Sequence, residues 1–70
     1  MGLVKIRIRE FATKQGWTLK EVSVRSGVPY GTIKTYALSQ GMAMADVSAL
    51  YKLARTFDVL MEDLVEVVKE

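Results

Sequence analysis

The sequence predicts an all-α protein, a compact bundle of five short helices that forms a single domain over residues 1–70. Three observations predict this fold class. Apolar residues recur at helical spacing along most of the chain. Residues typical of helix starts and stops divide these stretches into short segments. The length of 70 residues, half of them hydrophobic, allows one small core and excludes a disordered tail.

The first two helices are predicted from the residues at their ends. We expect a helix from about Ile6 to Gln15, ended by Gly16. Thr18 and Glu21 have the spacing of a capping box, in which the Thr hydroxyl accepts from the amide of residue 21 and the Glu carboxylate reaches back to residue 18. Gly27 is suited to the left-handed conformation that ends this second helix.

A third helix is expected to start at Pro29, because proline has no amide hydrogen to leave unpaired at a first helical position. We expect it to run to about Leu38 and to be closed by Gly41. After a loop over residues 39–45, Asp46 is a good N-cap for a fourth helix, and Asp58 a left-handed stop after it. The residues expected to hold the helices together in the core are Val22, Val28, Ile33, Tyr36, Leu50, Leu53 and Phe57.

The two ends of the chain are ambiguous between helix and strand. Over Leu60–Glu70 one helical face is apolar and the other acidic, which indicates a fifth helix. The run from Leu64 to Val68 is rich in β-branched residues, however, and apolar residues alternate with basic ones from Val4 to Arg9. The alternative is therefore that the two ends pair as short strands.

Charge and composition exclude several classes of function. Residues 1–41 hold seven basic groups against two acidic ones, and residues 42–70 hold three against six. The basic half permits binding to a polyanion such as DNA. Cys and His are both absent, which excludes disulfides, thiolate zinc sites and the usual general base. We expect no enzyme, metal, cofactor or small-molecule substrate.

No segment has the composition of a membrane span. The longest stretch without charge, Thr35–Ala45, has eleven residues, whereas a spanning helix needs about 20 apolar ones. Lys5, Arg7 and Arg9 interrupt the start of the chain before any apolar run develops, so no signal peptide is visible. We expect a soluble, cytoplasmic protein.

Two short helices joined by a tight glycine turn form a helix-turn-helix, here over about residues 18–38. In this register the chain resembles the Cro/C1-type helix-turn-helix domains of phage repressors and small bacterial regulators. The residues that carry the resemblance are Val22 before the turn, Gly27 in it, Val28 after it, and Ile33 and Tyr36 on the inner face of the helix that follows the turn. The resemblance implies a lambda-repressor-like fold.

The resemblance also implies which residues touch DNA. In that family the helix after the turn enters the major groove, and the start of the helix before it meets a phosphate. The matching positions for base contacts are Tyr30, Gly31, Lys34 and Thr35. The matching positions for phosphate contacts are Thr18, Leu19, Lys20 and Pro29.

The chain departs from the family pattern at several positions. Many relatives carry Gln where Leu19 stands, and a leucine side chain supports no phosphate contact. The Arg–Glu pair of the phage repressors falls on Ala12 and Ala37, which leaves no unpaired charge. The loop over residues 39–45, usually basic, carries no charge.

The function implied is that of a DNA-binding transcriptional regulator, a homodimer on a two-fold operator. An apolar excess offers surface for the dimer, at Met42, Met44, Leu60 and Met61. The alternative is a helix-turn-helix module that binds another protein, such as an antitoxin or an accessory subunit. Leu19, the uncharged loop and the shortage of base-reading side chains favour that alternative.

Overall fold

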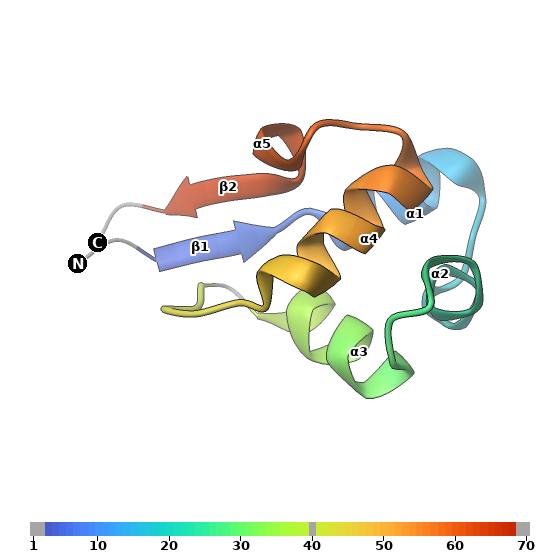
Figure 1. Ribbon diagram of the computed structural model, residues 1–70, viewed down its shortest axis with the longest axis horizontal. Helices are drawn as coiled ribbons and strands as arrows, with labels where there is room; N and C mark the ends of the chain where they lie inside the picture. The colour runs from blue at the N-terminus through green and yellow to red at the C-terminus, as the bar shows by residue number, and fades with distance from the viewer. Residues whose placement is uncertain (1–2, 40, 69–70) are drawn as a thin grey trace.

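The computed structural model describes residues 3–39 and 41–68. Five helices and two strands lie within these residues (Figure 1). The five predicted helices are therefore confirmed, and the alternative that the two ends pair as strands is also correct. Gln40, in the predicted loop, and residues 69–70, in the predicted last helix, lie outside the described residues. The elements in chain order are β1 (Leu3–Ile6), α1 (Ile8–Gln15), α2 (Leu19–Ser26), α3 (Tyr30–Leu38), α4 (Val47–Phe57), α5 (Met61–Leu64) and β2 (Val65–Val68).

The first helix begins later than predicted. Ile6 is the last residue of β1, where it pairs with Val65 in an antiparallel register. The Arg7 amide donates to the Leu64 carbonyl at 2.8 Å, so the backbone of residue 7 is still hydrogen-bonded to the segment that pairs with β1. Helix α1 starts at Ile8, and the prediction of a helix from Ile6 is wrong by two residues.

The last segment is helical for a single turn and then extended. Helix α5 ends at Leu64, and the chain continues directly as β2. Val65, Val67 and Val68 are β-branched and fit a pleated strand better than a helix. The prediction of a helix beyond Leu64 is therefore wrong, and strand pairing with β1 replaces it.

The helix ends at Gly16, Gly27 and Asp58 are as predicted, and the left-handed conformation expected at Gly27 and Asp58 is found at Gly16 as well. The φ angles are +74° at Gly16, +79° at Gly27 and +58° at Asp58. The Thr18 hydroxyl accepts from the residue 21 amide at 3.1 Å, which confirms one half of the capping box. The other half is wrong: the Glu21 carboxylate accepts from the Arg25 side chain at 3.0 Å.

Two smaller predictions about α3 need correction. Pro29 is the N-cap, in an extended conformation, and Tyr30 is the first helical residue. The helix ends at Leu38 as predicted, but Ser39 caps it in an extended conformation, so Gly41 does not close it. Pro29 still supports the helix, because its carbonyl accepts from the Ile33 amide at 3.1 Å.

The core lies between the helices and one face of the two-stranded sheet. All seven predicted core residues are buried. Ile8 and Leu64, which were not among the seven, are completely buried as well. Trp17 and Phe11 are half-buried and pack against Phe57, with ring centroids 5.8 Å and 5.7 Å away. The remaining buried residues are Ile6, Ala12, Ala49 and Ala54.

The connection from α3 to α4 is tied down at two points. Val4 and Met42 exchange two backbone hydrogen bonds of 2.9 Å and 2.8 Å, which attaches the loop to β1. The Tyr36 hydroxyl accepts from the Asp46 amide at 2.9 Å, and the Asp46 carboxylate caps α4 by accepting from the Ser48 amide, as its predicted N-cap role requires. Met44, in the same loop, is 85% exposed.

In the part of the chain that the structure describes, no helix is both long and apolar enough to cross a bilayer.

Candidate nucleic-acid interface

The outer face of α3 is presented to solvent because its inner face is anchored in the core. Ile33 is fully buried and Tyr36 nearly so. At 3.6 residues per turn, these two anchors leave the opposite side of α3 facing solvent. The four predicted base-contact residues, all exposed, are Tyr30, Gly31, Lys34 and Thr35.

The start of α2 lies beside this face. Trp17, stacked on Phe57, fixes the chain just before the helix, and the Arg25 guanidinium lies 4.4 Å from the centroid of the Trp17 ring. The Thr18 cap then sets the direction of α2. The first helical residue, Leu19, is half-buried and packs against the core.

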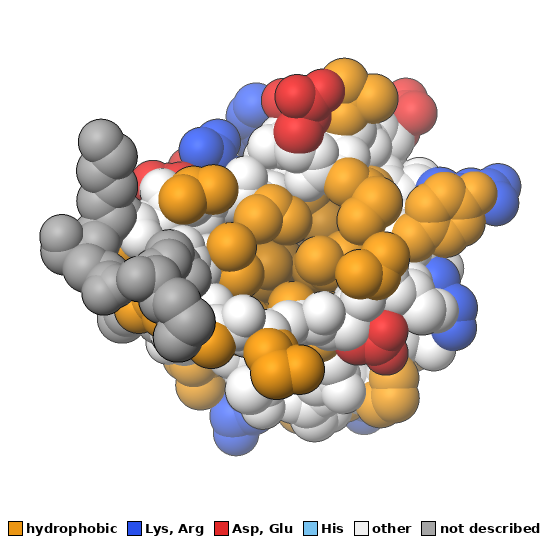
Figure 2. Space-filling model, turned by 60° about the vertical axis from the view of Figure 1, so that its left-hand side comes forward, with side chains coloured by type: hydrophobic (Ala, Val, Ile, Leu, Met, Phe, Trp, Pro, Cys, Tyr) orange, Lys and Arg blue, Asp and Glu red, His pale blue; other side chains and the backbone are white. Residues whose placement is uncertain are grey.

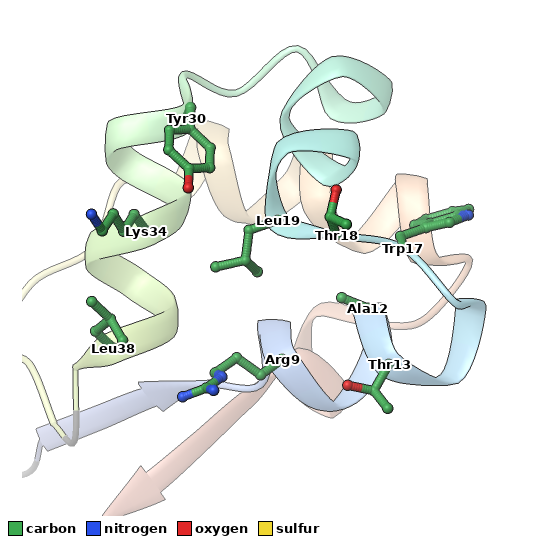
Figure 3. Close-up of a pocket in the computed structure, with 9 residues that line it drawn as sticks. All are labelled: Arg9, Ala12, Thr13, Trp17, Thr18, Leu19, Tyr30, Lys34 and Leu38. Carbon is green, nitrogen blue, oxygen red and sulfur yellow. The ribbon is translucent and has the colours of Figure 1, made fainter.

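A hollow of about 290 Å³ lies between three elements, which are α1, α3 and the start of α2. Figure 3 shows Tyr30, Lys34 and Leu38 in a row along α3, with Leu19 projecting from α2 into the space between the helices and Arg9 reaching in from α1. The remaining lining residues are Ala12, Thr13, Trp17 and Thr18.

The structure brings some of the predicted site residues together and not others. Thr18, Leu19, Tyr30 and Lys34 line the hollow, so half of the predicted set shares one surface. Lys20, together with Thr18, Glu21 and Val24, lines a separate depression on α2. The other three, which are exposed but are not part of the lining, are Pro29, Gly31 and Thr35.

Three further residues of this surface were not predicted from the sequence: Arg9, Thr13 and Leu38. Arg9 and Thr13 each follow a buried residue of α1, four positions apart, and so lie on one exposed side of that helix. That periodicity indicates their exposure, but only the packing of α1 beside α3 places them near Lys34. Leu38 is 57% exposed, although its apolar character suggests the core.

The hollow is positively charged around an apolar centre. Arg9 and Lys34 supply two cations, and no carboxylate is among the described residues that line it. The two acidic residues nearest along the chain each lie beside an arginine outside the lining: Glu10 is 4.0 Å from Arg7, and Glu21 is 2.9 Å from Arg25. Such a surface suits a ligand that combines negative charge with apolar edges.

Comparison with known proteins identifies a relative of nearly the same length. The chain is 38% identical over 61 residues to an uncharacterized HTH-type transcriptional regulator of Archaeoglobus fulgidus, an alignment that covers 87% of this chain and 84% of the relative. No protein-family model matches the chain. No solved structure matches it significantly.

Proposed function

Because the chain belongs to the family of HTH-type transcriptional regulators, we propose that it binds double-stranded DNA in the Cro/C1 manner and regulates transcription in the cytoplasm. In this proposal α3 lies in the major groove and the start of α2 rests on a phosphate. The role is one of binding, without catalysis or a cofactor.

The observation that carries the proposal is the shared surface of α2 and α3. Thr18 and Leu19 at the start of one helix and Tyr30 and Lys34 on the other line the same positively charged hollow. A DNA-reading helix needs an exposed outer face and a neighbouring group that fixes its position on the backbone. Both are present within this one surface.

The outer face of α3 is proposed to read bases. Lys34 donates to guanine O6 and N7, and Thr35 contacts either a polar base edge or a thymine methyl group. Tyr30 donates from its hydroxyl or stacks on a sugar. Gly31 has no side chain and leaves open space around its Cα, so the groove wall can approach the backbone there.

The phosphate contacts are proposed to come from the start of each helix and from α1. Thr18 and Lys20 lie at the start of α2, where amides, helix dipole and positive charge act together, and Leu19 contributes its backbone amide. Pro29, just before α3, lies against the DNA backbone in this proposal. Arg9 adds a cation from α1 on the same surface.

The protein is proposed to act as a homodimer on a two-fold operator. A single domain of this size reads only a few base pairs, and a dimer doubles the length of the site. The half-sites would then lie about one turn of DNA apart, roughly 34 Å.

A titration of random-sequence duplex DNA at two salt concentrations tests the proposal. We expect binding that weakens steeply between about 50 and 200 mM salt, because neutralised phosphates release counterions. Lys34→Ala should weaken binding to the preferred sequence by about 10- to 100-fold. Lys52→Ala is the matched control: an exposed lysine on α4 outside the hollow, whose loss should leave affinity nearly unchanged.

A protein-binding module remains the second candidate, favoured by Leu19 and Leu38. These two side chains give the hollow an apolar centre, and Leu38 is 57% exposed. If no duplex binds at low salt, this candidate replaces the first. An antitoxin or accessory subunit would then use the same surface for a protein partner.

A further inference from the structure

Helix α4 leaves one of its sides exposed to solvent. Its buried residues face the core, and the opposite side carries Tyr51, Lys52 and Arg55, all of them exposed. Tyr51 and Arg55 are one helical turn apart, and the Arg55 guanidinium lies 5.9 Å from the centroid of the Tyr51 ring. This side of α4 therefore combines an aromatic ring with two positive charges.

A basic depression of about 470 Å³ lies between this side of α4 and the end of α2. It is lined by Arg25, Ser26, Tyr51, Lys52, Arg55 and Thr56, and no carboxylate is among the described residues that line it. The Arg25 guanidinium is held by Glu21, 2.9 Å away, and by the Trp17 ring. Within residues 3–39 and 41–68, no acidic side chain forms an ion pair with Lys52 or Arg55. These two charges are therefore open to a negatively charged partner.

An apolar hollow of about 430 Å³ adjoins the basic depression, because Tyr51 and Arg55 line both. The other apolar residues that line it are Ala54, Val59, Leu60 and Met61. Leu60 is 62% exposed and Tyr51 is 53% exposed. Figure 2 shows hydrophobic side chains gathered over the face that contains α4 and the strands. Contiguous exposed apolar area of this kind marks an interaction surface.

We propose that the basic depression and the apolar hollow together bind a segment of another protein, with acidic side chains at one end and large apolar side chains at the other. The acidic side chains pair with Lys52 and Arg55, and the apolar ones pack on Tyr51 and Leu60. Glu62 determines the orientation, because it lines the apolar hollow and repels an acidic side chain there. This inference goes beyond the proposed function, since it assigns a protein partner to a surface that reads no DNA.

A protein segment fits this surface better than a second nucleic acid does. A phosphate backbone pairs with cations but brings no apolar group to cover Leu60 and Met61. A wholly apolar partner, in turn, takes Lys52 and Arg55 out of water without giving them a counter-charge. A segment that carries both kinds of side chain satisfies both hollows at once.

The surface stays accessible when DNA is bound in the proposed manner. Thr18 and Leu19, at the start of α2, line the hollow beside α3, whereas Ser26, the last residue of α2, lines the basic depression. The 8 residues of the helix separate its two ends by about 12 Å. DNA and the protein partner therefore use opposite ends of α2, and the chain can hold both together.

Fluorescence anisotropy with synthetic peptides tests the two chemical requirements. The first probe is a dye-labelled peptide in which a run of glutamates precedes a run of leucines. Two matched probes replace the glutamates by lysines or the leucines by serines. We expect saturable binding of the first probe that weakens with salt, and binding of the other two that is weaker by about tenfold or more. Failure of the first probe to bind, or equal binding by either matched probe, overturns the proposal.

Two pairs of matched variants locate the glutamate–leucine peptide on the chain. Leu60→Ser should weaken its binding about tenfold and keep the fold, because Leu60 is exposed and serine suits the N-cap position that it occupies before α5. Leu38→Ser, at a leucine that is 57% exposed, is its control. Lys52→Glu should weaken binding about as much, and Lys14→Glu, an exposed lysine on α1, is its control. A control that loses as much affinity as its counterpart places the peptide elsewhere and overturns the proposal.

A competition with duplex DNA separates this proposal from the proposed function. We expect the glutamate–leucine peptide to remain bound when duplex is added in excess, because the two ligands use opposite ends of α2. Displacement of the peptide by duplex assigns this side of α4 to nucleic acid and overturns the proposal. If the chain binds the peptide as described but binds no duplex, the proposed function fails and the protein-binding surface on α4 stands.

Discussion

Replacing Tyr36 with Phe removes a single oxygen from a site that the core holds fixed. Tyr36 is 8% exposed, and its hydroxyl accepts from the Asp46 amide at 2.9 Å. Phe fills almost the same volume, so the packing of α3 is retained. The variant therefore isolates one hydrogen bond between α3 and the start of α4.

The expected loss of unfolding free energy is about 0.5–1.5 kcal/mol, the net value of a protein hydrogen bond. Asp46 is exposed, so water can reach its amide once the hydroxyl is gone, and the loss should fall in the lower half of that range. In a domain of this size 1 kcal/mol corresponds to about 4–8 °C in Tm.

Urea denaturation of the Tyr36→Phe variant measures this loss as a lowered midpoint with an unchanged slope. Tyr30→Phe is the matched control: Tyr30 is 47% exposed, and the unfolding midpoint of this variant should not move. An unchanged midpoint for Tyr36→Phe would refute the reasoning. So would a loss above about 3 kcal/mol, because a single solvated hydrogen bond cannot supply it.

Three further predictions concern the start of α2. Thr18→Ala should cost about 1 kcal/mol of stability through loss of the cap on the Glu21 amide, measured by denaturation. Thr13→Ala, its exposed control, should stay within about 0.5 kcal/mol of the parent. Leu19→Gln should strengthen DNA binding at matched salt, since an amide reaches the phosphate that leucine cannot; a folded variant that binds no better contradicts the proposed orientation of α2. Lys20→Ala should weaken binding to all duplexes alike and reduce the salt slope by about one ion, whereas sequence-dependent weakening would make Lys20 a base contact.

Local signals in the sequence predicted most of the helical fold. The cap at Thr18, the left-handed ends at Gly27 and Asp58, and the buried Ile33 all follow from residues within one or two turns of each other. The sequence predicts the strands only as an alternative to helices, because β1 and β2 are separated by most of the chain. The alternating pattern near Val4 indicates a strand only once its partner is known, and that partner, Val67, lies at the other end of the domain.

The candidate site was predictable where it lies on one helix. Tyr30 and Lys34 are a turn apart on α3, and the buried Ile33 between them determines their direction. Arg9 was missed because its place in the hollow depends on how α1 packs beside α3, which no short-range pattern encodes. Sequence neighbours also need not share a surface: Lys20 follows Leu19 in the chain, yet it lines a different depression.

The pairing of Leu3–Ile6 with Val65–Val68 has a consequence for synthesis of the protein. During synthesis β1 leaves the ribosome before β2, and the helices α1 to α5 are made between them. The helices α1 to α4 can associate while translation continues, but β1 waits beside them with an unpaired edge. The sheet closes only after residue 68 has left the exit tunnel, so this domain completes its fold only after all of its described helices have been made.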